Sequence, residues 1–290
     1  MFYNFYMHSQ SENTGRNPNG QWRLIKSSPS SAAFNMSLDE ALLISTAQKH
    51  ALPTLRLYSW MVPSISLGYA QPSLDVDQQE LSNHAWQLVR RPTGGKAILH
   101  TDELTYSISA PLDEPLVLGS LLESYQRISL GLQKALQQLG LQTIAENKSD
   151  LPDEHSRTEP VCFQTPSNYE ITWKNKKLIG SAQARKHSGV LQHGSLPLCG
   201  DLSRITQVLA YPSQMDRDIA AQKTLARATT LEDATGKIFT WDEAADAIIR
   251  SFSAEFGITF LESLPTQEEM DITSNLVQSK YDSHSWNYRI

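Results

Sequence analysis

The sequence contains a cysteine and a lysine whose spacing could build a reactive thiol. Cys162 precedes a predicted strand, and Lys177 begins the strand that returns after a tight turn. Cysteine attacks as its thiolate, and a nearby ammonium group lowers the pKa of a thiol towards neutrality. If the hairpin brings Lys177 beside the segment that follows Cys162, the pair is a nucleophile ready for covalent catalysis. Taken singly, a free cysteine also fits a small buried hydrophobe, and a lysine near a turn also fits an exposed surface position.

A glycine pair between two predicted strands could form part of a binding site. It lies in RRPTGGKAILH, residues 90–100, which supplies the candidate binding residues Arg90, Arg91, Gly94, Gly95 and His100. Paired glycines let the backbone turn sharply and present amide N–H groups to a bound carbonyl or phosphate, and the arginines add positive charge. Without its neighbours this segment also fits a simple tight loop. A lone histidine beside a strand also fits a hydrogen-bonded structural role.

A run of small residues after the lysine could leave room for a ligand. Lys177 is followed by two apolar residues and then by Gly180, Ser181 and Ala182. Small side chains on a strand allow a ligand to lie along the backbone. These three residues are therefore further candidates for a substrate-binding wall.

Regular elements on either side must position these motifs. The residue pattern predicts a hairpin that turns at Asn175–Lys176, and further strands in TLRLYSW, SISLGYAQ, WQLVRR and ELTYSISAP. Helical periodicity and capping residues predict helices over 118–139 and 241–256, one that begins at Thr266, and one with a capping box at Ser37–Glu40. With no repeat and no low-complexity linker between them, these elements predict one compact α+β domain.

The composition is that of an ordinary globular protein. Of 290 residues, 40% are hydrophobic and 19% are charged, which suffices for one large core. Residues 1–20 contain little to bury, so we expect a disordered tail followed by a catalytic domain over 21–290. A net charge of −6 argues against nucleic acid or an acidic membrane as a partner.

Cysteine usage and hydropathy indicate a cytoplasmic protein. No apolar run approaches the roughly 20 residues that cross a bilayer, and the amino terminus lacks the apolar centre of a signal peptide. The chain has only two cysteines, and we expect both to be reduced. Cys199 has no nearby cationic partner in the sequence and is interpreted as structural.

Together, the three motifs resemble the lipoate-protein ligase A and octanoyltransferase family, which is related in fold to the biotin protein ligases. The resemblance covers most of residues 22–290, and the matching segments occur in the family's order: LRLYSW, SISLGYAQ, VRRPTGGKAILHTDELTYS, SNYEI, KKLIGSAQARKHSGVLQHGSL and SKYDSHSWNYR. It implies a single α+β catalytic domain of the biotin/lipoate-ligase type, with mixed β-sheets flanked by helices.

Within that family, the Cys-Phe-x-x-Pro-Ser pattern resembles the branch that transfers octanoyl groups from octanoyl-acyl carrier protein to lipoyl domains. In this branch the cysteine carries the acyl group as a thioester, and a lysine fifteen residues later lowers its pKa; Cys162 and Lys177 occupy those places. The resemblance implies an acceptor lysine in a glycine cleavage H protein or a 2-oxoacid dehydrogenase E2 subunit. It implies no cofactor, metal or ATP, because a thioester is already activated.

Two other functions stay open. An ATP-dependent lipoate ligase would use Lys177 to hold lipoyl-adenylate and would leave Cys162 idle, and a catalytically silent acyl-binding protein could retain the fold. Ligases of this family carry three glycines where this chain has Gly94-Gly95-Lys96 and usually carry an additional small carboxy-terminal domain, so both differences favour a transferase. A zinc site is disfavoured because neither cysteine has a second ligand at the usual spacing.

Overall fold

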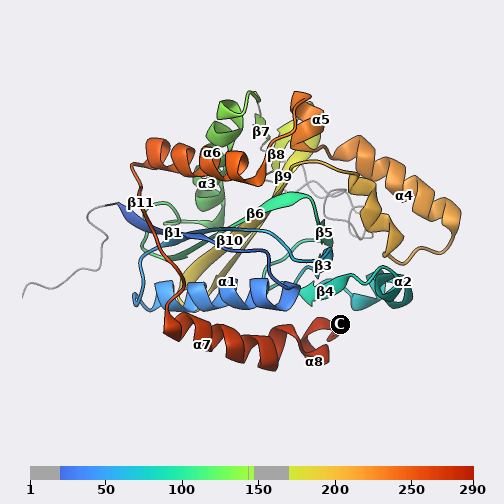
Figure 1. Cartoon of the computed structure of the whole chain (residues 1–290), viewed down its shortest axis with the longest axis horizontal. Coiled ribbons are helices and arrows are strands. Elements are labelled where there is room, and N and C mark those ends of the chain that lie inside the picture. Colours follow the sequence, from blue (N-terminus) through green and yellow to red (C-terminus); the bar gives the residue numbers. More distant parts are fainter. Residues whose placement is uncertain (1–19, 143, 147–169) are drawn as a thin grey trace, which may run out of the picture.

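The computed structural model describes residues 20–142, 144–146 and 170–290, which form two β-sheets with helices packed around them (Figure 1). The larger sheet has the strand order β11-β1-β2-β6-β10-β9-β8-β7 and the smaller one β4-β3-β5. The strands of the larger sheet are β1 (Gln21–Lys26), β2 (Thr54–Tyr58), β6 (Glu103–Pro111), β7 (Ile144–Glu146), β8 (Glu170–Trp173), β9 (Lys176–Lys186), β10 (Gly189–Pro197) and β11 (Thr259–Glu262). Those of the smaller sheet are β3 (Ser64–Leu67), β4 (Gln87–Arg90) and β5 (Ile98–His100).

Both sheets are mixed. β1 pairs in parallel with β2 and β11, whereas β2, β6, β10, β9, β8 and β7 pair antiparallel in succession. In the smaller sheet β3 is parallel to β4 and antiparallel to β5. The expected fold class, mixed sheets flanked by helices, is therefore confirmed.

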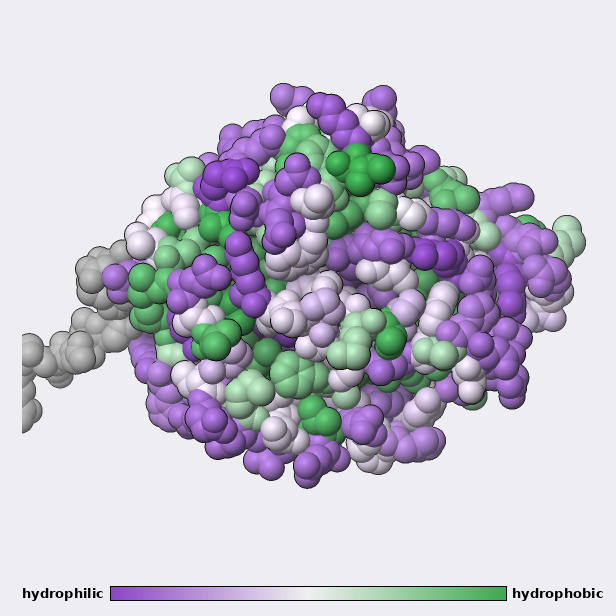
Figure 2. Space-filling view, viewed as in Figure 1, coloured by the Kyte–Doolittle hydropathy of each residue, from purple (hydrophilic) through white to green (hydrophobic). Residues whose placement is uncertain are grey.

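Helices cover the two faces of the larger sheet (Figure 1). The helical segments are α1 (Ala32–Ala47), η1 (Ser73–Asp75), α2 (Gln78–Asn83), α3 (Leu121–Gln138), η4 (Leu202–Gln207), α4 (Gln214–Arg227), α5 (Leu231–Thr235), α6 (Trp241–Phe256), α7 (Gln267–Leu276), η5 (Val277–Tyr281) and α8 (His284–Asn287). α3 and α6 lie on one side of the sheet and α1 and α7 on the other. Between the sheet and the α3–α6 pair, the main core buries side chains such as Ile108, Leu132 and Phe252. On the face seen in Figure 2, hydrophilic residues predominate and apolar ones are dispersed among them.

Capping residues explain where several helices begin and end. α6 starts after Thr240, whose hydroxyl accepts from the backbone of Glu243, and it ends at Gly257 in the left-handed conformation. These bounds match the predicted 241–256. α7 likewise follows the predicted Thr266 cap. α3 begins at Leu121, later than the predicted residue 118, because Ser120 rather than a preceding residue supplies the capping box.

The predicted start of α1 was wrong. The helix begins at Ala32 because the Ser31 hydroxyl accepts from the backbone N–H of Phe34, so the expected box at Ser37–Glu40 lies inside the helix. Instead of capping, the Glu40 carboxylate accepts hydrogen bonds from Lys280 at 2.6 and 2.8 Å. Glu40 thus takes part in a long-range ion pair with Lys280, whereas the local sequence pattern had assigned it to a helix cap.

The β8–β9 hairpin turns one residue earlier than predicted. Lys174 and Asn175, rather than Asn175 and Lys176, occupy the turn, with φ angles of 47° and 63°. Two successive left-handed residues give the tight turn that matches the twist of a hairpin. The resulting register places Thr172 opposite Lys177.

Two predictions from the sequence lie outside the described residues. The tail expected over residues 1–20 falls there except for Gly20, and so does Cys162. Within the described ranges, no helix is long and apolar enough to cross a membrane.

Candidate active site

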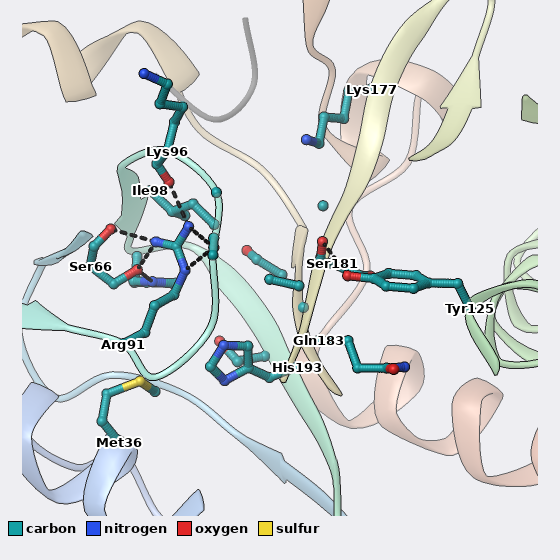
Figure 3. Close-up of a pocket in the computed structure, with 18 of the residues that line it drawn as sticks. Met36, Ser66, Arg91, Lys96, Ile98, Tyr125, Lys177, Ser181, Gln183 and His193 are labelled. Atoms are coloured by element: carbon teal, nitrogen blue, oxygen red, sulfur yellow. Dashed lines mark hydrogen bonds between the residues drawn. The ribbon is translucent and has the colours of Figure 1, made fainter. Parts of the chain in front are cut away.

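A cavity of about 350 Å³ lies between the β9–β10 wall of the larger sheet and the loop that joins β4 to β5 (Figure 3). The β9–β10 wall contributes Lys177, Gly180, Ser181, Ala182, Gln183, His193, Gly194 and Ser195. The opposite wall and the ends contribute Met36, Tyr58, Trp60, Ser66, Arg91, Gly94, Gly95, Lys96, Ile98, His100, Thr105, Leu121 and Tyr125. The fold therefore brings together the glycine loop and the small-residue strand, which the sequence named separately.

Lys177 is a buried cavity residue with a carboxylate partner. Its Nζ lies 2.6 Å from Oε1 of Glu170, and both side chains are buried. Glu170 begins β8, the strand paired with β9, so the hairpin itself creates the ion pair. Sequence reasoning missed Glu170, although an acidic residue on the strand opposite a lysine is a signal for a cross-strand pair. The positive charge of Lys177 at the cavity is therefore partly compensated by the Glu170 carboxylate.

Arg91 holds the glycine loop in place. Its guanidinium donates to the carbonyl oxygens of Ser66 at 2.7 Å, Gly94 at 2.8 Å and Lys96 at 2.7 Å. Arginine suits this task because its planar group offers five donors in fixed directions. Arg91 thus borders the cavity, but the contacts of its guanidinium fix the loop conformation rather than point charge at a ligand.

Arg90 is not among the described residues that line the cavity. Its guanidinium is fully buried and donates to the carbonyl oxygens of Gly68 at 2.8 Å, Gln71 at 2.5 Å and Asn287 at 2.8 Å. The structure therefore does not bring Arg90 to the cavity with the other candidates, and its donors tie the carboxy-terminal segment to the loop after β3. Arg90 is the last residue of β4 and Arg91 is the residue after it. Because successive side chains of extended chain point to opposite sides, the two arginines face different surroundings.

The glycine loop passes very close to the end of β3. Gly95 has a φ of 95°, a conformation that favours glycine. A Cβ atom built on Gly68 would overlap the carbonyl oxygen of Gly95. Only glycine at position 68 therefore permits this approach.

Gly68→Ala is expected to displace the Gly94–Gly95 loop and to lower, about tenfold, the acyl transfer that the family resemblance implies, because the methyl group has no space beside the Gly95 backbone. Gly94→Ala is the matched control, since a Cβ there meets no atom within 4 Å. Steady-state transfer rates of the two purified variants check this expectation. A Gly68→Ala protein with wild-type activity would contradict the close-packing argument.

His100 has both ring nitrogens engaged. Nε2 lies 2.7 Å from the hydroxyl of Ser66, Nδ1 lies 2.7 Å from Oε1 of Glu103, and the ring stacks on Trp60 with centroids 3.9 Å apart. Burial raises the pKa of Glu103, but His100 and hydroxyl donors outweigh burial and lower that pKa overall. The sequence left open a hydrogen-bonded structural role for His100, and these contacts fit that role. His100 also borders the cavity.

The small-residue wall is fixed by hydroxyl contacts. Ser181 Oγ lies 2.7 Å from the phenol oxygen of Tyr106, and burial raises the pKa of Tyr106 to about 12. The opposing Gly194 leaves the needed space, since a Cβ there would come within 2.6 Å of the Tyr106 ring. A neutral, uncharged wall therefore runs from Gly180 to Ala182 along the cavity.

The second cysteine lies elsewhere. Cys199 follows β10 and is not among the described residues that line the cavity. Burial raises the pKa of the Cys199 thiol, and the Asp102 carboxylate raises it further. A thiol with a raised pKa is poorly ionised at neutral pH, which agrees with a structural role. In the part of the chain that the structure describes, no cluster of His, Cys, Asp and Glu could hold a metal ion.

Comparison with known proteins identifies similar sequences and folds. The lipoyl protein ligase A/B catalytic domain family matches residues 31–253. Octanoyltransferase LipM of Carboxydothermus hydrogenoformans is 37% identical over 270 residues, covering 92% of this chain and 98% of that protein. Octanoyltransferase LipM of Kyrpidia tusciae is 38% identical over 275 residues, covering 92% and 98%.

Solved structures of lipoate ligases share the fold. The bi-partite lipoate protein ligase of Thermoplasma acidophilum, whose partner is an E2 lipoyl domain, gives a TM-score of 0.76 at 26% identity and covers 92% of this chain and 96% of its own. Lipoate-protein ligase A bound with ATP gives a TM-score of 0.75 at 24% identity, covering 92% and 98%. The latter likeness establishes the fold alone.

Proposed function

The chain belongs to the lipoyl protein ligase A/B catalytic domain family, and from that premise we propose that it is an acyltransferase that moves octanoyl groups in protein lipoylation. The observation that carries the proposal is its 37% and 38% identity to octanoyltransferases over 92% of its length. We assign the activity to one catalytic domain over residues 21–290. Because the reaction needs a free thiol, we place it in a reducing compartment, the cytoplasm.

The cavity supports acyl binding. Its volume of about 350 Å³ lies in the range of small-molecule sites, and Trp60 is among its apolar lining residues. Met36 and Ile98 are two further apolar residues of the lining (Figure 3). Lys177 and the Gly180–Ala182 wall face the glycine loop across this space. An extended octanoyl chain would therefore lie against apolar surface with its carbonyl end near polar backbone.

Acyl transfer begins in this proposal with attack by Cys162, which lies outside the described residues. Its thiolate sulfur bonds to the carbonyl carbon of octanoyl-acyl carrier protein, the donor's C–S bond breaks, and the departing thiolate takes a proton. Lys177 favours the attacking thiolate electrostatically. Backbone N–H groups of Gly94, Gly95 or the Gly180–Ala182 strand stabilise the oxyanion. No metal, nucleotide or other cofactor enters the reaction, because the thioester supplies the activated acyl group.

The acceptor in the second step is the lysine amine of a lipoyl domain, in a glycine cleavage H protein or a 2-oxoacid dehydrogenase E2 subunit. Its nitrogen bonds to the acyl carbon, the C–S bond to Cys162 breaks, and an amide results. The relation to a Thermoplasma ligase that is paired with an E2 lipoyl domain supports this class of acceptor.

Transfer is expected to proceed without nucleotide. After exhaustive removal of ATP and magnesium, the protein should still move octanoyl groups from octanoyl-acyl carrier protein to a lipoyl domain, as followed by the mass of the acceptor. The alternative is an ATP-dependent lipoate ligase, because both structural neighbours are named lipoate protein ligases and one of them is bound with ATP. An absolute requirement for ATP, with pyrophosphate released from lipoate and ATP, would establish that alternative.

A further inference from the structure

The acyl cavity adjoins a larger outer pocket of about 610 Å³. Gly94, Gly95, Lys96 and Gln183 border both spaces, so the glycine loop forms the boundary between them. The outer pocket also includes Tyr69, which is 39% exposed and marks its solvent side. An acceptor lysine that arrives from the surface would therefore cross this boundary to reach an acyl carbonyl in the inner cavity.

A chain of three buried polar residues lies at that boundary. Thr93 lines the outer pocket and His193 lines the inner cavity. Thr93 Oγ1 lies 2.6 Å from Nε2 of His193, and Nδ1 of His193 lies 3.2 Å from Oδ2 of Asp39. All three side chains are buried. The arrangement is hydroxyl, imidazole and carboxylate in series, as in enzymes that move a proton from a nucleophile.

The surroundings of Asp39 fix the tautomer of His193. Asp39 accepts from Arg56 at 2.8 Å and from Tyr58 at 2.9 Å; burial raises its pKa, but Arg56 and His193 outweigh burial and lower the pKa overall. An ionised Asp39 accepts from Nδ1–H, which leaves Nε2 to accept from the Thr93 hydroxyl. Burial also lowers the pKa of His193, so the ring is neutral near neutral pH and able to take a proton.

Aminolysis of a thioester needs such a group. The amine must be neutral when it attacks and must give up a further proton as the C–N bond forms. Lys177, which lines the inner cavity, is paired with Glu170. Ser66, His100 and Glu103 form a second series of hydroxyl, imidazole and carboxylate. Of the two hydroxyls, only that of Thr93 belongs to the described lining of the outer pocket, from which the acceptor lysine arrives. Lys96, which borders both spaces, is a cation and favours a neutral amine rather than accepting its proton.

We propose that Thr93, His193 and Asp39 form the proton relay for transfer to the acceptor lysine, an inference that rests on the proposed octanoyl transfer. As the amine nitrogen bonds to the acyl carbon and the C–S bond breaks, the amine proton passes to Thr93 Oγ1 while the Thr93 proton passes to Nε2 of His193. Asp39 stabilises the imidazolium, which then releases its proton to solvent. The thiolate of Cys162 is regenerated, so charge and atoms balance.

The relay is tested by separating the two half-reactions in Thr93→Val and Thr93→Ser. Valine keeps the shape of threonine without the hydroxyl, and serine keeps the hydroxyl. Rapid mixing with octanoyl-acyl carrier protein, followed by intact-mass analysis, gives the rate of acyl-enzyme formation. Adding the lipoyl domain of an E2 subunit to the isolated octanoyl-enzyme gives the rate of the second step. We expect Thr93→Val to slow only the second step, by about tenfold, and Thr93→Ser to remain near wild type.

His193→Gln is the second variant, since glutamine can accept from Thr93 but cannot take up the proton. It should slow the second step and remove its dependence on pH on the acid side, where His193 would be protonated in the wild type. Equal slowing of both half-reactions, or an unchanged second step in Thr93→Val, would show that the three residues only support the fold. Absence of an octanoyl-enzyme in the wild type would instead overturn the proposed function and the relay with it.

Discussion

Cys162→Ala is expected to abolish octanoyl transfer, by at least about 10³-fold, while leaving the fold intact. The thiolate is the proposed acyl carrier, and alanine offers no atom that can replace it. Cys162→Ser should also be inactive, because a serine hydroxyl at neutral pH is a far weaker nucleophile than a thiolate. The measurement is octanoyl transfer to a lipoyl domain, with circular dichroism of each variant as the check on folding.

Cys199→Ser is the matched control for the nucleophile. Cys199 lies outside the described cavity lining, and burial and Asp102 raise its pKa, so its replacement should keep most activity. Near-normal octanoyl transfer by the Cys162→Ala protein would contradict the covalent mechanism. An inactive Cys199→Ser protein beside an active Cys162→Ala protein would identify the other thiol as the nucleophile.

Lys177→Ala should slow acyl-enzyme formation about 10²-fold near neutral pH. A cation within about 4 to 6 Å of a thiol favours its ionised form, so removing the cation raises the thiol pKa and leaves less thiolate. The variant should also lose stability, because it removes the cation paired with the buried Glu170 carboxylate at 2.6 Å. The measurement is the pH dependence of iodoacetamide alkylation at Cys162, which should move to higher pH.

Glu170→Gln provides a change of opposite sign at the same ion pair. It keeps an oxygen near the Lys177 ammonium but removes the negative charge that compensates it. The thiol should then ionise more readily, and the alkylation curve should move to lower pH. Lys177→Arg keeps the charge but brings a larger planar group beside Gly180 and Ser181, so a partial loss is expected. Curves that overlap for wild type, Lys177→Ala and Glu170→Gln would show that Lys177 has another role, such as acyl binding.

Local sequence patterns predicted those features whose causes are local. Thr240 and Gly257 bound α6 because capping and left-handed termination depend on a few neighbouring residues. Gly94 and Gly180 were recognised as binding-site candidates because small residues leave space, and the structure places both on the cavity lining. The hairpin turn was predicted one residue too late, at Asn175–Lys176 instead of Lys174–Asn175. Both turns contain Asn175, which tolerates the left-handed region, so the local sequence does not distinguish between them.

Contacts between distant segments account for what the sequence did not predict. Arg90 was assigned to binding on its charge, yet its donors are satisfied by backbone carbonyls that lie up to 197 residues away. Thr93 and His193 are 100 residues apart, and His193 and Asp39 are 154 apart, so no local pattern joins them. Such pairings depend on strand order and helix packing, which a single sequence does not specify.

The acyl-enzyme is the most direct test of the central claim that Cys162 carries the octanoyl group. The protein is mixed with octanoyl-acyl carrier protein in nucleotide-free buffer and analysed by intact mass and then by peptide mapping. The account predicts a single octanoyl adduct on the peptide that contains Cys162, and its loss when a lipoyl domain is added. An unmodified enzyme that still octanoylates the lipoyl domain, or an adduct confined to Cys199, would contradict it.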